Sequence, residues 1–174
     1  MLDAPKGLPV RPTTDFAKTG LFNILRNRFS LEEMKCLDLF AGTGNITFEL
    51  CSEGSNDVTA IDVSEKCIAY IRKVSATLQE PGIHVMRADV FEFLKRCHTR
   101  YDLIFADPPY ERKDKSQIHE LISARGLLNP GGVFILEHQS KETFSDLKGF
   151  ESVRTYGNVA FSFFSNLDAE TELP

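Results

Sequence analysis

Residues 37–45 read Leu-Asp-Leu-Phe-Ala-Gly-Thr-Gly-Asn, and this stretch decides the fold class. It begins as an apolar run, typical of a short buried strand, and Gly42 and Gly44 then let the backbone turn tightly into a helix. A dinucleotide-binding loop has a third glycine three residues later, but here that position is Thr47. Asp38, ahead of the loop, is unfavourable for a phosphate and suits a cationic or amine-bearing ligand. The stretch therefore predicts a ligand-binding strand–loop–helix unit, with a purely structural turn as the alternative.

Strands and helices alternate on both sides of this loop. Apolar runs predict buried strands at residues 36–40, 58–61, 83–86, 103–106 and 133–136. Residues 13–28 and the segment after Ser64 instead repeat their apolar residues at helical spacing. Thr13 or Thr14 can cap the first of these helices, and Ser64 can cap the second. The alternation predicts an α/β fold, a parallel sheet with helices on both faces.

The end of the chain has a different pattern. Residues 152–156 and 159–164 read as two strands joined by a Gly-Asn pair, which predicts an antiparallel hairpin. Residues 129–132, Asn-Pro-Gly-Gly, predict a turn before the fifth strand, and residues 142–148 predict a short helix. The sheet is therefore expected to have seven strands, mostly parallel, with the hairpin at its C-terminal end.

The composition indicates one domain. The chain has 174 residues, of which 42% are hydrophobic, with 14 Phe and no Trp. We expect an extended segment at residues 1–12, a single domain at 13–165 and an acidic, disordered tail at 166–174. No apolar stretch suits a membrane helix, and the scattered cysteines predict reduced thiols in a cytoplasmic protein. The net charge of -5 disfavours a general nucleic-acid coat protein, although residues 1–30 hold five basic residues against two acidic ones.

Two further carboxylates follow predicted strands. Asp62, 18 residues after Gly44, can accept hydrogen bonds from ribose hydroxyls or cap the following helix. Asp89 and Glu92 fit a capping box, and the alternative is recognition of an adenine ring near Asp89 or Val90. A ribose is common to NAD and S-adenosylmethionine. Only S-adenosylmethionine combines an ammonium group and a sulfonium with no phosphate, as the acidic glycine loop favours.

Residues 107–110, Asp-Pro-Pro-Tyr, follow the fourth predicted strand and are the most informative motif. Pro108 and Pro109 stiffen the loop and remove two N–H donors, which leaves the Asp107 carboxylate and the Pro108 carbonyl as acceptors. An aromatic amine is a poor nucleophile, and two acceptors on its hydrogens can orient it. Tyr110 offers a ring on which an unstacked base can stack. The motif predicts a site for methylating an exocyclic amine, with a plain surface turn as the alternative.

These motifs, in this order, resemble those of the Rossmann-like, class I methyltransferases that depend on S-adenosylmethionine. The chain is more similar still to the bacterial 16S rRNA guanine-N2 methyltransferases of the RsmD type. The residues that carry this likeness are 8–15 (Leu-Pro-Val-Arg-Pro-Thr-Thr-Asp), 21–23 (Leu-Phe-Asn), 37–44, 105–110 and Glu137-His138.

The resemblance implies methyl transfer from S-adenosylmethionine to a guanine N2 of 16S rRNA, either free or in a partly assembled small ribosomal subunit, by a monomer. The implied catalytic residues are Asp107, Pro108, Pro109 and Tyr110. The implied cofactor-binding residues are Asp38, Phe40, Gly42, Gly44, Asn45, Asp62, Val63, Asp89 and Val90. The implied substrate-binding residues are Arg11, Tyr110 and His138. His138 could equally hold the sheet edge, and no histidine spacing suggests a metal.

Three alternatives stay open. An adenine-N6 or other amino methyltransferase of DNA or RNA would use the same loop, and transfer assays on each nucleic acid would separate them. A nicotinamide-dependent oxidoreductase is disfavoured by the missing third glycine, and binding of NAD but not S-adenosylmethionine would support it. A non-catalytic RNA-binding module would bind rRNA without releasing S-adenosylhomocysteine.

Overall fold

A computed structural model describes residues 14–165 and 167 of the chain. The segment predicted to be extended, residues 1–12, and all but one residue of the predicted acidic tail lie outside this range. The helices are α1 (Asp15–Arg28), a 3-10 turn (Leu31–Glu33), α2 (Asn45–Ser52), α3 (Glu65–Leu78), α4 (Val90–Arg96) and α5 (Lys115–Ala124). The strands are β1 (Lys35–Leu39), β2 (Asp57–Asp62), β3 (Ile83–Arg87), β4 (Tyr101–Ala106), β5 (Leu128–Gln139), β6 (Phe150–Tyr156) and β7 (Val159–Phe164).

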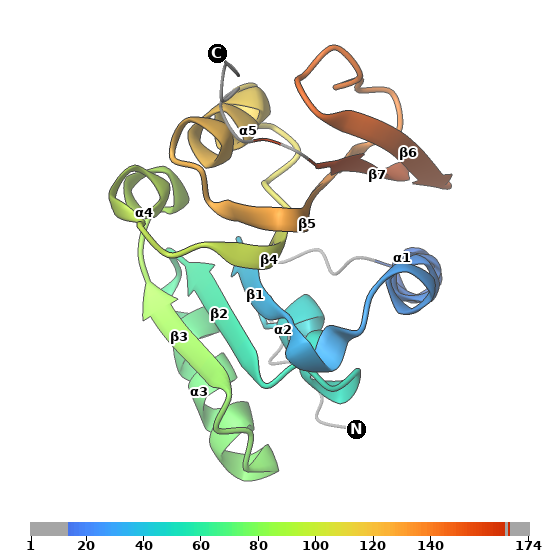
Figure 1. Cartoon of the computed structure of the whole chain (residues 1–174). Coiled ribbons are helices and arrows are strands. Elements are labelled where there is room, and N and C mark those ends of the chain that lie inside the picture. The colour runs from blue at the N-terminus through green and yellow to red at the C-terminus, as the bar shows by residue number, and fades with distance from the viewer. Residues whose placement is uncertain (1–13, 166, 168–174) are drawn as a thin grey trace.

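The strands form one sheet of seven in the order β3-β2-β1-β4-β5-β7-β6 (Figure 1). The first five are parallel, and β7 runs antiparallel to both β5 and β6. Tyr156 pairs with Val159 across the two-residue link, where Gly157 has a φ of +62°. The predicted α/β architecture and the C-terminal hairpin are confirmed.

The two faces of the sheet hold separate hydrophobic cores because side chains alternate along each strand. Ile104 and Ala106 pack with residues of α4 and α5, whereas Leu103 and Phe105 pack with residues of α1 and α2. Helices therefore cover both faces, as Figure 1 shows. Phenylalanine supplies much of this packing, and Phe161, Phe163 and Phe164 on β7 are fully buried.

Two local predictions were wrong. Residues 129–132 lie within β5 as an irregularity, where Tyr101 pairs with Leu128 but Leu103 pairs with Val133. The Asn129 side chain donates to Asp102 at 2.8 Å, so the Asn-Pro-Gly-Gly segment bulges without leaving the sheet. Residues 142–148 form isolated turns instead of a helix, with Leu147 N–H donating to the carbonyl of Phe144.

Helix α1 contacts α2 on the same face of the sheet. Thr14 caps it by accepting from the amide of Ala17 at 3.3 Å. Lys18 donates to the Asn45 side chain at 3.0 Å and pairs with Glu49 at 2.8 Å. These contacts fix the start of α2, which directly follows the glycine loop.

Candidate functional site

Two loops leave the sheet side by side at its carboxyl edge. The last residues of β1 and β4, Leu39 and Ala106, are partners in the parallel ladder. The glycine loop follows the first, and the Asp-Pro-Pro-Tyr loop follows the second. The amide of Asp107 donates to the carbonyl of Leu39 at 3.3 Å and joins the two loops. Sheets of this kind bind ligands at this edge.

A cavity of about 430 Å³ opens at this edge. Its lining includes Phe40, Asp62, Val63, Ser64, Cys67, Ala88, Asp89, Val90, Asp107, Pro108, Pro109, Tyr110, Glu111 and Arg112. A shallower hollow of about 710 Å³ lies along α3 and β3, but none of the motif residues lines it. We therefore take the smaller cavity as the site, because it gathers residues from four separate segments that the sequence analysis predicts to bind ligand.

Most of the predicted site residues come together in this cavity. Nine of them are part of its lining: Phe40, Asp62, Val63, Asp89, Val90, Asp107, Pro108, Pro109 and Tyr110. Asp38, Gly42, Gly44, Asn45 and His138 are not part of the lining, and Arg11 lies outside the described residues.

The glycine loop is shaped by left-handed backbone and held by Asp62. Phe40, Gly42 and Gly44 have φ values of +62°, +56° and +81°. Only glycine adopts this region without strain, so Phe40 is a strained residue at the cavity wall. The Asp62 carboxylate accepts from the amides of Gly42 and Ser64, both at 2.8 Å. Asp62 thus connects the glycine loop to Ser64, the residue that caps α3, and it also lines the cavity.

Asp38 lies beneath the loop instead of facing the cavity. Its side chain is buried and accepts a hydrogen bond from the Thr47 hydroxyl at 2.6 Å. Burial raises the pKa of Asp38 to about 7, and the Thr47 bond opposes this shift. Thr47, at the position of the missing third glycine, therefore links α2 to β1.

Asp89 is confirmed as a helix cap and also lies at the cavity, where its predicted role toward the adenine ring stays a prediction. Its carboxylate caps α4 by accepting from the amides of Phe91 and Glu92, at 3.0 and 3.1 Å. The same residue lines the cavity next to Val90.

In the acceptor loop, residues 107–110, Asp107 has acidic neighbours. Burial raises the pKa of Asp107 well above its ordinary value, and the carboxylates of Glu137 and Asp38 raise it further. Lys115 opposes this rise. Such a cluster favours a cationic ligand close to Asp107.

His138 is buried in the sheet. Its Nδ1 lies 2.8 Å from the carbonyl of Gln139, and its Nε2 lies 2.8 Å from the Ser162 hydroxyl. A carbonyl can only accept, so Nδ1 donates and Nε2 accepts from the hydroxyl. Burial lowers the pKa of His138, which favours this neutral form. These contacts fit the sheet-edge reading of His138.

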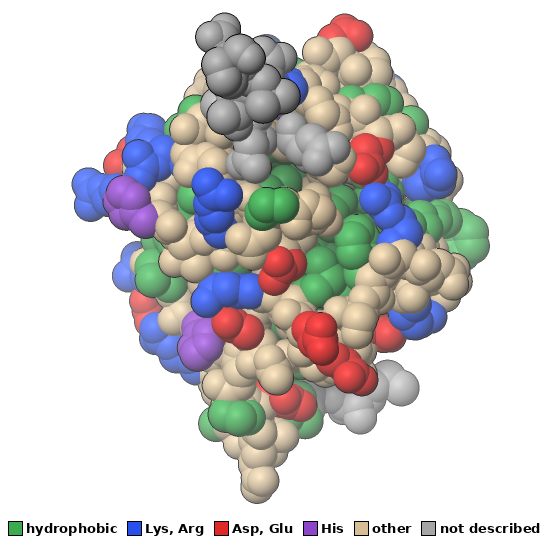
Figure 2. Space-filling model, in the orientation of Figure 1, with side chains coloured by type: hydrophobic (Ala, Val, Ile, Leu, Met, Phe, Trp, Pro, Cys, Tyr) green, Lys and Arg blue, Asp and Glu red, His purple; other side chains and the backbone are tan. Residues whose placement is uncertain are grey.

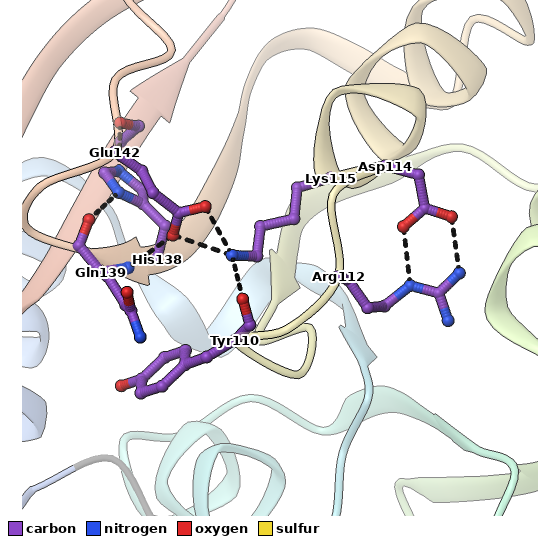
Figure 3. A network of polar contacts seen from close by, with 8 residues as sticks. Tyr110, Arg112, Asp114, Lys115, His138, Gln139 and Glu142 are labelled. Atoms are coloured by element: carbon purple, nitrogen blue, oxygen red, sulfur yellow. Dashed lines mark hydrogen bonds and ion pairs between the residues drawn. The ribbon is translucent and has the colours of Figure 1, made fainter.

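Four charged residues near the loop were not among the predicted site residues (Figure 3). Arg112 donates to both carboxylate oxygens of Asp114, at 2.9 and 2.7 Å, and lies 4.5 Å from the centre of the Phe91 ring. Lys115 and Glu142 form an ion pair at 2.7 Å behind Tyr110. Lys115 and Glu142 are 27 residues apart, so no local sequence pattern predicts that they pair. Arg112, in contrast, lies only two residues after the Asp-Pro-Pro-Tyr motif, and this proximity could have identified it.

The part of the chain that the structure describes contains neither a cluster of metal ligands nor a membrane-spanning helix. Within residues 14–165 and 167, no three His, Cys, Asp or Glu side chains gather as metal ligands. In the same residues no helix has the length and apolar character needed to cross a bilayer.

The family model described as "Conserved hypothetical protein 95" matches residues 1–165. The chain belongs to this family of RsmD-type methyltransferases. It is 30% identical over 131 residues to the ribosomal RNA small subunit methyltransferase D of Buchnera aphidicola, a match that spans 75% of this chain and 66% of that protein.

Solved structures share the fold of this RsmD-type chain. A hypothetical protein from Thermus thermophilus superposes with a TM-score of 0.81 at 26% identity, covering 94% of this chain and 92% of the other. The T. thermophilus 16S rRNA N2 G1207 methyltransferase, in complex with AdoMet and guanosine, superposes with a TM-score of 0.72. At 23% identity, covering 91% of this chain and 45% of the other, this second match speaks for the fold alone.

Proposed function

We propose that this chain transfers the methyl group of S-adenosylmethionine to the exocyclic N2 of a guanine in small-subunit rRNA. The observation that carries the proposal is the rigid Asp-Pro-Pro-Tyr loop, which lines the same cavity as Asp62 and Asp89. Family membership supports the reaction type, and the name of the Buchnera relative supports the class of RNA.

The cavity suits the proposed cofactor in charge and in shape. Asp62 has two carboxylate oxygens beside the glycine loop, each with capacity to accept from a ribose hydroxyl beyond its present amide bond. Phe40 and Val90 offer apolar surface for the adenine ring. The acidic groups around Asp107 favour the positive charge of the sulfonium. When bound, the cofactor supplies an electrophilic methyl carbon.

The acceptor loop would hold the guanine amine against that methyl. The Asp107 carboxylate and the Pro108 carbonyl accept the two amine hydrogens, and the Tyr110 ring supports the base. Attack by the nitrogen lone pair would form the N–C bond as the S–C bond of the bound donor breaks, which would release a neutral thioether. The nitrogen gives up one proton, and the raised pKa of Asp107 suits its carboxylate to receive it. Catalysis by such a site consists mainly of positioning.

The RNA partner is proposed as 16S rRNA in a partly assembled small subunit. On the face drawn in Figure 2, basic and acidic side chains lie among one another. The net charge of -5 also gives little general attraction to phosphate. We therefore expect ribosomal proteins to contribute to the substrate surface.

Tritiated-methyl transfer tests the proposal directly. Unmodified 16S rRNA, free and partly assembled, is incubated with the protein and labelled S-adenosylmethionine, and the nucleosides are then analysed. We expect label in N2-methylguanosine. Label in N6-methyladenosine, or transfer to DNA alone, would assign the loop to another amine, and no transfer to any nucleic acid would refute the proposal.

A further inference from the structure

Lys115 is a buried cation in an unfavourable place. It is the first residue of α5, and the residue is only 1% exposed. Burying an ammonium group costs free energy unless it is paired, and the positive end of the helix dipole repels it. Its contacts must offset both costs.

Those contacts run directly to the acceptor loop, as Figure 3 shows. The Lys115 ammonium donates to the Tyr110 carbonyl at 3.1 Å and to the Glu142 carboxylate oxygens at 2.7 and 2.8 Å. An ammonium group has three hydrogens, so these bonds use its full donor capacity. Glu142 also accepts from the amide of Gln139 at 3.0 Å. One ion pair thus joins the loop, the start of α5 and the end of β5.

We propose that Lys115 and Glu142 are positioning residues, which hold the Asp107–Tyr110 loop in the arrangement that orients the substrate amine. Prolines stiffen the loop internally, but they remove the amide hydrogens that could otherwise anchor it to its surroundings. Lys115 supplies that anchor by donating to the loop's last carbonyl. This inference deepens the proposed function and rests on it.

The positive charge of Lys115 also acts on titratable side chains of the site. Asp107 and His138 both experience its positive charge, which opposes the rise in the pKa of Asp107. Glu137 and Asp38 act on Asp107 in the opposite direction. Lys115 therefore combines a mechanical contact with a counter-charge, and the two effects can be measured separately.

Lys115→Met is the main test, because methionine is unbranched like lysine, only one atom shorter, and carries no charge. Lys95→Met, which removes a lysine that pairs with Glu92 on the exposed side of α4, is the matched control. For Lys115→Met we expect kcat for methyl transfer to fall roughly 10- to 100-fold, since small misplacements of reacting groups have effects of that size. The Kd for S-adenosylmethionine and the KM for RNA should stay within about threefold of the parent values.

The pH profile separates positioning from a merely structural role. Without Lys115 the pKa of Asp107 should rise further, so the loss of activity on acidification should begin at a higher pH than in the parent. Glu142→Gln, which keeps the side-chain shape, should lower kcat in the same way. The double variant should lose little more kcat than Lys115→Met alone, because both changes break the same Lys115–Glu142 ion pair.

Hydrogen–deuterium exchange provides a readout that needs no turnover. The amide of Arg112 donates to the Pro109 carbonyl at 3.0 Å, so its exchange reports on the loop. It should become faster in Lys115→Met and stay unchanged in Lys95→Met. Unchanged exchange, or parent-like kcat with a parent-like pH profile, would overturn the inference. Absence of transfer by the parent protein would instead refute the proposed function, and the exchange result would still decide whether Lys115 anchors the loop.

Discussion

The glycine loop and the acceptor loop leave neighbouring strands of one sheet, yet they are held by opposite means. The glycine loop uses left-handed backbone at Gly42 and Gly44, and the amide of Gly42 donates outward to Asp62. The acceptor loop has prolines where such amides would be, and its carbonyl accepts from Lys115. The first loop therefore presents donors to an anionic anchor, and the second presents acceptors to a cationic one.

This difference matches the two chemical tasks that we propose for the loops. A cofactor loop needs close approach of the backbone, which glycine permits. A loop that binds an amine needs acceptors without competing donors, which proline ensures. If the comparison is correct, changes in the acceptor loop should affect turnover, and changes in the glycine loop should affect stability and cofactor affinity.

Asp107→Ala should have the largest effect. It removes one of the two acceptors for the amine, so methyl transfer should fall by at least about 100-fold. S-adenosylmethionine affinity, measured by calorimetry, should stay within a few-fold of the parent. Unchanged turnover would break the assignment of the acceptor loop.

Activity should depend on pH through the same residue. In the proposed mechanism the amine is oriented by the Asp107 carboxylate, whose pKa is raised by burial and by its acidic neighbours. Activity should therefore be full above this raised pKa and be lost as the pH falls through it, well above the range of an ordinary aspartate. A profile of kcat against pH that stays flat down to the range of an exposed carboxylate would contradict this.

Gly44→Ala should destabilise the fold more than Gly157→Ala. Both glycines have positive φ, which costs an alanine about 1–2 kcal/mol. A methyl group on Gly44 would also lie 2.9 Å from the Phe48 ring and 3.0 Å from Ile71, whereas nothing lies within 4 Å of that position at Gly157. We expect about 1 kcal/mol or more of additional loss at Gly44, measured by denaturant unfolding. Equal losses at both positions would show that packing around the glycine loop is loose.

Asp62→Asn should weaken S-adenosylmethionine binding roughly 10-fold, as expected for loss of charged hydrogen bonds. The amide group would face the donors of Gly42 and Ser64 with one acceptor instead of two. At saturating cofactor, kcat should change little. A large loss of kcat with an unchanged Kd for S-adenosylmethionine would show that Asp62 acts in turnover and not in cofactor binding, contrary to the roles proposed for the two loops.

Lys18→Met should have the smallest effect. Lys18 pairs with Glu49 and Asn45 near the glycine loop, but its side chain is 19% exposed. Partly solvated pairs of this kind contribute less than about 1 kcal/mol. Thermal unfolding should therefore shift only slightly, in contrast to the loss of turnover expected for Lys115→Met.

The sequence by itself determined the order of the elements and most of the cavity lining. Local patterns carry this information: apolar runs mark strands, caps such as Thr14 and Asp89 mark helix starts, and the two motifs lie at strand ends. The rule that ligands bind at the carboxyl edge then places both motifs together. The bulge at residues 129–132 was misread because Asn-Pro-Gly-Gly is locally a turn sequence, and only pairing with β4 keeps it in the sheet.

Tertiary structure alone decided which charged side chains meet. Asp38 was expected to face a cationic ligand, but the fold buries it against Thr47. Lys115 and Glu142 belong to no motif, and their ion pair forms because α5 and the turn after β5 pack on either side of the acceptor loop. Pairing between residues distant in sequence depends on how strands and helices pack. Short-range periodicity and propensity therefore do not predict such pairs.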